Sequence, residues 1–365
     1  MWWIYCFTAL ICLLYFILIT IFYIGWRRIS AFVPNGNELI CPKISVVVAC
    51  RNEEDNILKL ISCLAQQSNQ NFELILVNDH SIDATRNFIK KAQATLPKIQ
   101  LIDANGYGKK NALKEGISKS NGELIITTDA DCLPSFQWLE TIACFYSKYP
   151  GDLIICPVKL SGNDHLFSYL QVLEFTSLIA SGSGAAGAGM PILCNGANLV
   201  FTKKVWQESI ADLHEEEQSG DDMFLLESVK KKGGVVRFLK AESAIVITKQ
   251  SATLSEFIKQ RRRWASKSSA YTDWQLIFTA CTVLSINLLI LILVSLSFFN
   301  STLLLVLLTL FLFKYAVDTI FLYSVSMFFQ LKSTWLHSLL LSIVYPFYIV
   351  FVAFSGLLIK QNKWK

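Results

Sequence analysis

Four long apolar segments constrain this chain more than any other feature of its sequence. They cover residues 2–26, 276–299, 302–329 and 336–359. A helix rises about 1.5 Å per residue, so each segment is long enough to cross the ~30 Å of hydrocarbon in a bilayer. The chain is 53% hydrophobic and only 17% charged, which is too apolar for a single ordinary soluble domain. The sequence therefore predicts a membrane protein with a globular region between the first and second segments.

The first apolar segment fits an uncleaved membrane anchor better than a signal peptide. It has no basic start, its apolar part is too long, and no small-residue cleavage site follows it. Arg27 and Arg28 come directly after it, which predicts an outside amino end and a cytoplasmic globular region at the plasma (inner) membrane. The ten scattered cysteines, without a CxxC pair, fit buried side chains in a reducing compartment.

The carboxyl-terminal segments leave the topology open. Four full spans would put the carboxyl terminus outside, whereas the lysines at 360, 363 and 365 favour the cytoplasmic side. One apolar segment is therefore expected to be re-entrant or interfacial, and the charged third segment is the candidate. Its charges, Lys314 and Asp318, lie four residues apart, which suits a structural ion pair better than a transport site.

The globular region alternates strand and helix patterns. Residues 44–49 form a β-branched run without alternation, as expected for a strand buried on both faces of a sheet. An amphipathic helix pattern follows over 57–64. We predict further strands over 73–77, 99–102 and 123–132, with helices over 85–94 and after Gly108. This order predicts an α/β fold with a mostly parallel sheet. The small-residue segment 181–191 is expected to be a flexible loop or a close-packing helix end.

Acidic residues follow two of these strands, at the edge of the sheet where ligands bind. Asp79 and Asp83 follow the second strand, and Asp129 and Asp131 follow the fourth. Simpler explanations exist: Asp83 suits a helix cap, Asp79 suits a turn, and a single Asp-x-Asp is weak evidence. Two neighbouring carboxylates repel each other, however, which favours a divalent cation between them and a phosphorylated ligand beside it.

Three later segments add polar and charged groups. Gly108, Lys109 and Lys110 offer a turn and positive charge for phosphates, although lysines at helix starts are common on surfaces. Residues 195–198 form a small polar turn before an apolar strand. A break at Ser219 or Gly220 precedes a helix that begins with two aspartates, 221 and 222. Acids there stabilise a helix by about 0.3–1 kcal/mol, and the functional alternative is a general base.

The motif KQRRRW lies shortly before the second apolar segment. Basic residues collect on the cytoplasmic side of membrane spans, which explains the arginines but not the glutamine or the tryptophan. Gln260, Arg263 and Trp264 lie at i, i+3 and i+4, so one face of a helix presents all three. Arg261 and Arg262 remain available to contact lipid headgroups.

In this order the motifs resemble those of membrane-integrated family 2 glycosyltransferases, the group that includes ceramide glucosyltransferase, hyaluronan synthase and cellulose synthase. The similarity runs from about Lys43 to Trp264, through ACRNEEDNI, VNDHSID, GKKNAL, DAD, NGAN, GDD with MFLL, and QRRRW. It implies a glycosyltransferase-A (Rossmann-like) domain. Asp221 stands where the family usually has glutamate, and Cys50 where it has a small residue or proline. We expect neither to change the chemistry.

The resemblance also implies a role for each motif residue. The catalytic residues are Asp222, as the base, and Asp221 beside it. Asp131 and Asp129 hold Mg²⁺ or Mn²⁺. Asp79 contacts the nucleoside, Arg263 faces the pyrophosphate and Trp264 faces the acceptor. The full donor-binding set is Arg51, Glu53, Asp79, Lys109, Asp129, Gln260 and Arg263. The acceptor-binding set is Asn195, Gly196 and Trp264.

The implied reaction is an inverting transfer of a sugar from a nucleotide-diphosphate sugar, with UDP expected, to a membrane lipid or lipid-linked glycan. Its place would be glycolipid or polysaccharide synthesis of the cell envelope. The partners are the donor, the acceptor and the bilayer. The net charge of +5 does not by itself suggest a nucleic acid polymer.

Four regions follow from these arguments: a membrane anchor over 1–28, a catalytic domain over 40–258, an interfacial helix over 259–274, and a membrane domain of about three helices over 275–365. A processive polysaccharide synthase is the alternative within the class, disfavoured because so small a bundle leaves little room for a channel. Outside the class stand a nucleotidyltransferase or phosphatase that uses Asp-x-Asp for metal, and a non-catalytic membrane scaffold or transporter.

Overall fold

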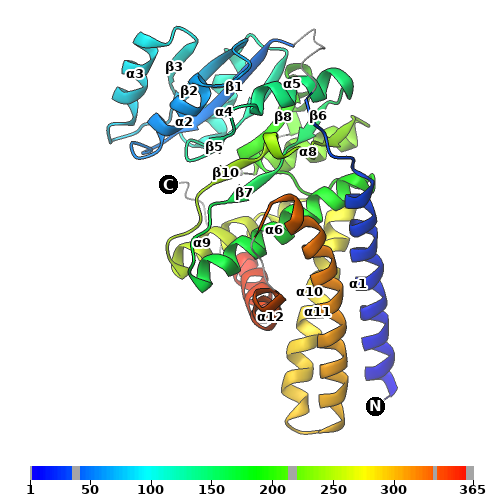
Figure 1. Cartoon of the computed structure of the whole chain (residues 1–365). Coiled ribbons are helices and arrows are strands. Elements are labelled where there is room, and N and C mark those ends of the chain that lie inside the picture. Colours follow the sequence, from blue (N-terminus) through cyan, green and yellow to red (C-terminus); the bar gives the residue numbers. More distant parts are fainter. Residues whose placement is uncertain (1, 35–41, 213–219, 332–334, 359–365) are drawn as a thin grey trace. The chain divides into compact units, whose positions relative to one another are not determined.

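The structure is a computed structural model, and it describes residues 2–34, 42–212, 220–331 and 335–358 (Figure 1). The chain forms two compact units. The membrane unit comprises Met1–Arg28, Gly162–Leu193 and Gln250–Gln361, and the sheet unit comprises Ile29–Ser161, Cys194–Lys249 and Asn362–Lys365. The carboxyl-terminal lysines and Ser219, which entered the sequence predictions, lie outside the described residues.

The sheet unit contains a seven-stranded sheet in the order β3-β2-β1-β4-β8-β6-β9 and a three-stranded sheet in the order β5-β10-β7. Strands β1 to β4 pair in parallel, whereas β8 is antiparallel to both β4 and β6. The strands are β1 (Ile44–Cys50), β2 (Phe72–Asn78), β3 (Ile99–Asp103), β4 (Leu124–Thr127), β5 (Leu133–Pro134), β6 (Leu153–Ile155), β7 (Val158–Leu160), β8 (Leu199–Thr202), β9 (Val236–Phe238) and β10 (Val246–Thr248).

Helices of the sheet unit bury apolar faces against these strands. All seven residues of β1 are buried, as its β-branched run predicts. Helix α4 packs closely on β1, because a Cβ atom at Gly116 would lie 2.7 Å from Val47. The helices are α2 (Ile57–Ala65), α3 (Thr85–Thr95), α4 (Lys109–Ser118), α5 (Trp138–Lys148), α7 (Lys203–Ser209) and α8 (Asp221–Lys231).

The first three predicted strands match β1, β2 and β3 closely, but the fourth is shorter than expected. It was predicted over 123–132, and β4 ends at Thr127. The chain then turns, with the Cys132 N–H donating to the Asp129 carbonyl at 3.1 Å. Leu133–Pro134 leaves the main sheet and pairs with β10 instead. The two acids of the DAD motif therefore lie on a turn beyond the strand.

The membrane unit contains six helices of seven or more residues among the described residues. They are α1 (Trp2–Arg28), α6 (Leu166–Gly187), α9 (Leu254–Ala265), α10 (Trp274–Ser297), α11 (Thr302–Phe328) and α12 (Trp335–Leu358). Four of them, α1, α10, α11 and α12, are long and apolar enough to cross a membrane. These four correspond to the four apolar segments, and they indicate an integral membrane protein.

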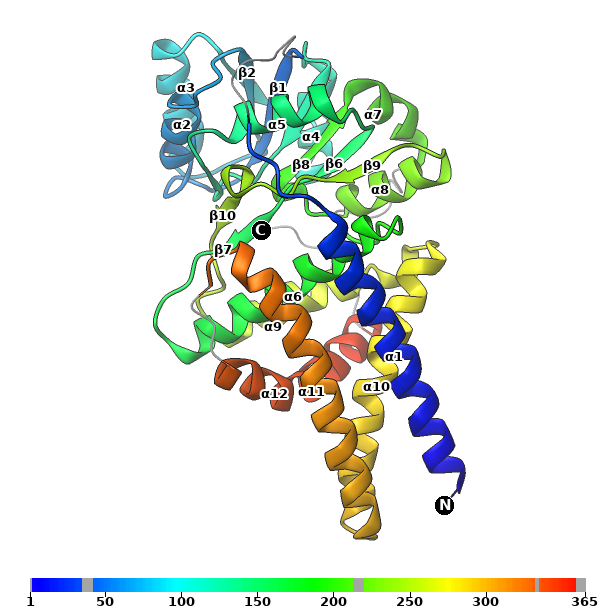
Figure 2. The same cartoon turned by 45° about the vertical axis from the view of Figure 1, so that its right-hand side comes forward.

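The membrane unit has two directions of packing (Figures 1 and 2). Helices α1, α10 and α11 run side by side and contact one another. Helix α12 lies across them and packs against α6 and α9. The crosswise helix is therefore the fourth apolar segment. The sequence had favoured the third segment, α11, as the re-entrant or interfacial one, because it contains charged residues. The charges of α11 are paired instead, with the Lys314 Nζ 2.6 Å from the Asp318 Oδ2.

The small-residue segment 181–191 includes the carboxyl-terminal part of α6, which confirms the second of its two predicted alternatives. Helices α1 and α6 meet there at very short range. A Cβ atom at Gly25 would lie 1.9 Å from the Gly184 carbonyl oxygen, and one at Gly184 would lie 2.4 Å from the Phe22 carbonyl oxygen. Only glycine at both positions allows this approach of two backbones.

Candidate active site

Asp79 joins the first three motifs at the carboxyl end of the sheet. It follows β2, is fully buried, and accepts the Gly108 N–H on both carboxylate oxygens at 3.1 Å. Arg51, which follows β1, places its Nη1 atom 3.6 Å from the Asp79 Oδ2. Gly108 has a φ of +95°, which favours glycine in this turn. The predicted nucleoside-contacting acid is therefore held by its neighbours on both sides.

Glu53 and Asp83 shape the turn beyond β1. The Glu53 N–H donates to the Thr85 Oγ1 at 2.7 Å, and its carboxylate accepts from Asn56 at 2.6 Å. Asp83 accepts the N–H groups of Thr85 and Glu54 at 3.0 and 3.1 Å. Partial burial alone would raise the pKa of Asp83, but these hydrogen bonds lower it overall. Asp83 thus stabilises the start of α3, which is the simpler of its predicted roles.

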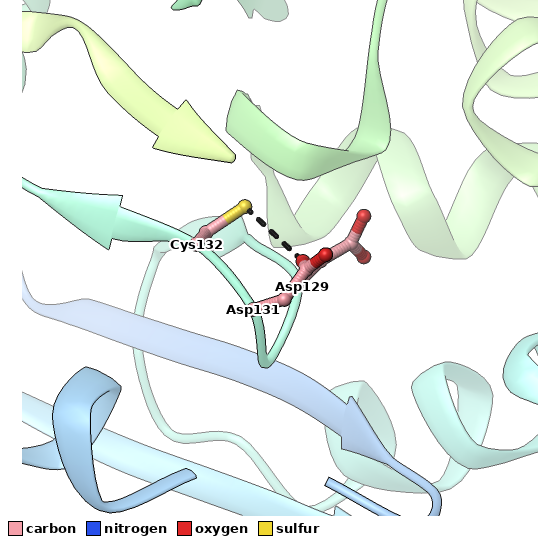
Figure 3. Close-up of side chains that lie close together, drawn as sticks. All are labelled: Asp129, Asp131 and Cys132. Carbon is pink, nitrogen blue, oxygen red and sulfur yellow. Dashed lines mark hydrogen bonds between the residues drawn. The ribbon is translucent and has the colours of Figure 1, made fainter. Parts of the chain in front are cut away.

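The DAD motif lies on the turn after β4, with its two carboxylates close together (Figure 3). Ligand atoms of Asp129, Asp131 and the neighbouring Cys132 all lie within 4.8 Å of one another. The Lys109 Nζ contacts the Asp129 Oδ1 at 2.5 Å, so a cationic group already sits at this carboxylate. Because β2, β1 and β4 are adjacent and parallel, Asp79, Arg51 and this turn follow their carboxyl ends at one edge.

The donor set of this turn fits a hard divalent cation. Asp129 and Asp131 are half-buried and offer carboxylate oxygens, the ligands that Mg²⁺ and Mn²⁺ prefer. Burial and the two neighbouring carboxylates raise the pKa of the Cys132 thiol far above its usual range. A neutral thiol is a weak ligand, so the residues that would hold a metal are the two aspartates.

Asp221 and Asp222 begin α8 but have different surroundings. Asp221 is buried, and its Oδ1 lies 3.7 Å from the Nζ of Lys110, which is also buried. Asp222 is half-buried and accepts the Gly196 N–H at 2.9 Å on Oδ2, while Oδ1 accepts the Met223 N–H. The second aspartate therefore keeps a half-buried carboxylate in a fixed orientation, which suits a general base.

The charge around Lys109 shows that three motifs meet. Burial by itself would lower the pKa of Lys109, but Asp129 first, and Asp222 and Asp221 after it, raise the pKa overall. The GKK, DAD and GDD motifs are thus within electrostatic reach of one another. The NGAN turn joins them through the bond from Gly196 to Asp222.

The two asparagines of the NGAN turn are already engaged within the sheet unit. The Asn195 Oδ1 accepts the Ala197 N–H at 3.0 Å and caps the short helix Gly196–Asn198. Asn198 is buried and donates to the carbonyls of Pro157 and Ala244. The backbone of Gly196 consequently faces the candidate base, while Asn198 fixes the turn.

The QRRRW motif lies on α9, within the membrane unit. Gln260, Arg263 and Trp264 are half-buried there, and their predicted roles toward the donor and acceptor stay predictions. The expected headgroup contact of Arg261 is wrong. Its side chain is only 4% exposed and makes two hydrogen bonds to Glu174 of α6, at 2.9 and 2.5 Å.

Sequence reasoning missed two of these partners. The sequence predicted only a basic turn for Lys110. In the structure, Lys109 pairs with Asp129 of the DAD motif and Lys110 with Asp221 of the GDD motif. The sequence does contain a signal for Glu174, because it is the one acid in α6, a 22-residue apolar helix. A single carboxylate in such a segment requires a buried partner.

Family models match the chain over most of its length. The model described as glycosyl transferase family 2 matches residues 45–198, and the model described as glycosyl transferase family group 2 matches residues 124–357. The second match covers more than half of the chain and extends through the membrane helices. A match of this extent is sufficient to assign the chain to this family.

Curated relatives align with shorter parts of the chain. A protein described as an uncharacterized glycosyltransferase from Haemophilus influenzae is 30% identical over 138 residues, covering 36% of this chain and 38% of that one. An undecaprenyl-phosphate 4-deoxy-4-formamido-L-arabinose transferase from Photorhabdus laumondii is 37% identical over 95 residues, covering 24% and 29%. The chain thus spans well under half the length of these relatives.

The chain resembles a solved structure over almost its whole length. That structure is the mannosyltransferase PcManGT from Pyrobaculum calidifontis, in complex with GDP-Man and Mn²⁺, with a TM-score of 0.54, 15% identity and 96% of each chain covered. At this identity the likeness shows the fold alone, and it confirms the predicted glycosyltransferase-A-like sheet with long apolar helices. With the family models, the conclusion is that this chain belongs to glycosyl transferase family 2 and is a glycosyltransferase.

Proposed function

We propose that this protein transfers one sugar from a nucleotide-diphosphate sugar to a lipid or lipid-linked acceptor in the membrane, with inversion at the anomeric carbon. The observation that carries the proposal is the convergence of Lys109, Asp129 and Asp222 at the carboxyl edge of the sheet. A cation beside two carboxylates, with a third carboxylate within electrostatic reach, suits a diphosphate, its metal and a base.

The donor would lie across the ends of β2, β1 and β4. Asp79 is buried and oriented by Gly108 and Arg51, and it would accept a hydrogen bond from the nucleobase. Lys109 would bind the diphosphate as a fixed cation. Mg²⁺ or Mn²⁺ at Asp129 and Asp131 would neutralise the charge that develops on the leaving diphosphate. The name of the Pyrobaculum relative, which binds GDP-Man and Mn²⁺, supports this donor class.

The reaction is a single displacement. The acceptor oxygen bonds to the anomeric carbon while the bond from that carbon to the diphosphate breaks, and the bonding electrons leave on the diphosphate. For a hydroxyl acceptor, Asp222 takes the proton, with its carboxylate held by Gly196 and Met223. A lipid phosphate has a second pKa of about 6, so its oxygen is largely deprotonated near neutral pH and needs the base less.

A lipid acceptor is favoured because the active-site motifs belong to a chain with four long apolar helices. The description of the Photorhabdus relative as an undecaprenyl-phosphate transferase supports a lipid phosphate in particular. Helices α1, α10 and α11 contact one another directly, so these three enclose no channel for a growing polymer. This arrangement favours single transfer over processive synthesis.

The proposal is tested by nucleoside diphosphate release from the full chain in detergent. Purified protein is given UDP- and GDP-linked sugars, Mn²⁺ or Mg²⁺, and either a polyprenyl phosphate or a diacylglycerol. The Asp222→Asn variant is compared with Asp212→Asn, which removes an exposed aspartate outside the motifs that bonds Lys232 and the Ser228 hydroxyl. Products are analysed by mass for the number of sugars and by NMR for the anomer.

We expect metal-dependent release from one donor and one sugar per acceptor. With a hydroxyl acceptor, Asp222→Asn should lower kcat by about 10²–10⁴-fold, as loss of a general base does. A phosphate acceptor predicts a much smaller loss, and Asp212→Asn should leave kcat within about twofold, as for a surface change. Release of pyrophosphate or phosphate instead, or no release from any donor, would refute the proposal.

A further inference from the structure

The membrane unit holds an ion pair buried where three of its helices meet. Arg261 of α9 and Glu174 of α6 are each 4% exposed, and the guanidinium bonds the carboxylate through Nε and Nη2. The Tyr348 hydroxyl of α12 donates to the Glu174 Oε1 at 3.0 Å. One carboxylate thus ties together helices that are far apart in the sequence.

The same guanidinium contacts two residues of the QRRRW motif. The Arg261 Nη1 donates to the Gln260 Oε1 at 2.5 Å. Its Cζ lies 4.2 Å from the centre of the Trp264 ring and 4.6 Å from that of Phe257. Arginine suits this position because its planar group bonds a carboxylate at one edge while aromatic rings stack on its faces. Lysine offers neither the two parallel bonds nor the flat face.

A buried ion pair is poor evidence for stability, because removing two charges from water costs about as much as their attraction returns. Such a pair is better explained by the geometry that it enforces. Here the enforced geometry is that of Gln260 and Trp264, since both side chains rest on Arg261, and Arg261 is oriented by Glu174. Arg263, at the third position of the predicted face, lies on the same turn.

We propose that Glu174, Arg261 and Tyr348 are positioning residues that hold Gln260 and Trp264 of α9 in the orientation needed for transfer. The inference rests on the proposed function for what Gln260 and Trp264 do, and on the contacts above for how they are held. Arg261 thereby has a task distinct from that of Arg263. Glu174 lies outside every motif, but the QRRRW motif needs it to orient Arg261.

The test uses the full chain in detergent with two readouts. Glu174→Gln keeps the shape but removes the charge, Arg261→Lys keeps the charge but removes the planar fork, and Glu174→Gln/Arg261→Gln removes the pair. Asp318→Asn is the matched control, because it breaks another ion pair of the same unit and touches neither Gln260 nor Trp264. Hydrogen exchange of residues 254–265 reports on α9, and steady-state transfer gives kcat and KM for donor and acceptor.

We expect Glu174→Gln and Arg261→Lys to speed exchange in α9 and to lower kcat/KM for the acceptor by about 10–100-fold, as small misplacements of reacting groups do. The double variant should be no worse than the poorer single variant, because the two residues act as a unit. Asp318→Asn should change both readouts by less than about twofold at equal folded fraction, because Asp318 bonds Lys314 and Tyr15 and not the residues that hold α9.

Three outcomes would overturn the inference. Unchanged exchange in Glu174→Gln would show that the pair does not hold α9. Faster exchange with unchanged transfer would show that α9 need not be held. Equal losses in Glu174→Gln and Asp318→Asn would show a general effect on folding. If the unmodified protein transfers no sugar, the proposed function fails separately, and hydrogen exchange still decides whether the pair holds the helix.

Discussion

At the scale of single residues, the pairing of Lys109 with Asp129 sets how the donor site responds to pH. The pKa of Lys109 is raised above its ordinary value of 10.5, so the ammonium stays charged throughout the neutral range. A group whose pKa is higher in the folded state than in the unfolded state stabilises the fold. This stabilisation is fully present below the unfolded-state pKa and is lost as pH rises through the folded-state pKa. As pH rises, the contribution of this ion pair should therefore persist through the neutral range and disappear in strongly alkaline solution.

Replacing Lys109 should weaken donor binding more than it weakens the fold. Lys109→Met removes the charge that contacts Asp129 and suits a diphosphate. We expect KM for the donor to rise by about 10–100-fold, since hydrogen bonds to charged groups contribute about 1.5–3 kcal/mol. Lys119→Met, an exposed lysine just after the same helix, is the control and should leave KM unchanged. Equal effects of both variants on donor KM would contradict this role.

A site residue was predictable from the sequence when its partner is close to it along the chain. Asp129 and Asp131 share one short turn after a strand, so their spacing alone places both at the sheet edge. Lys110 finds Asp221, and Arg261 finds Glu174, only after the chain has folded over many residues. Local spacing therefore predicted an exposed Arg261 at the membrane surface. In the structure, Arg261 is buried instead, because it pairs with the buried carboxylate of Glu174 in α6.

At the scale of secondary-structure elements, the crossing of α1 and α6 depends on two glycines. Gly184→Val would place side-chain atoms where the backbone of Phe22 lies, so the helices must separate. Overpacking of this kind costs about 1–3 kcal/mol, and more where backbones meet. We expect a lower melting temperature in detergent for Gly184→Val. Ala186→Val, a half-exposed position in the same helix, should have little effect, and equal melting of both variants would contradict the close crossing.

Elements with a continuous run of apolar residues were predicted well, and strands of two or three residues were not. The apolar segments and β1 are recognisable in the sequence because each is an almost unbroken run of apolar residues. Strands β5, β7 and β10 have two or three residues each, and they pair between distant parts of the chain. No local pattern marks a strand of that length, so the three-stranded sheet went unpredicted.

At the scale of the whole molecule, the crosswise α12 favours one of the topologies that the sequence leaves open. If α1, α10 and α11 span the bilayer and α12 lies along its surface, three spans return the chain to the side on which the sheet unit began. The lysines at 360, 363 and 365 then lie in the cytoplasm, as the excess of positive charge predicts. A polar network fits this assignment, since Tyr348 of α12 bonds Glu174 and α9 is basic.

This assignment predicts opposite accessibility for cysteines introduced by Ser301→Cys and Gln361→Cys, in a background where the six cysteines other than the buried ones at 50, 132, 144 and 156 are serine. Ser301 lies between α10 and α11, and residue 361 follows α12. In right-side-out vesicles, an impermeant maleimide should label the first variant at once and the second only after lysis. Lys119→Cys, in the sheet unit, marks the cytoplasmic response. Labelling of both variants in intact vesicles would mean that α12 spans the membrane. That result would contradict the assignment of α12 to the membrane surface. The bond from Tyr348 to Glu174 would then lie near one end of a membrane-spanning α12.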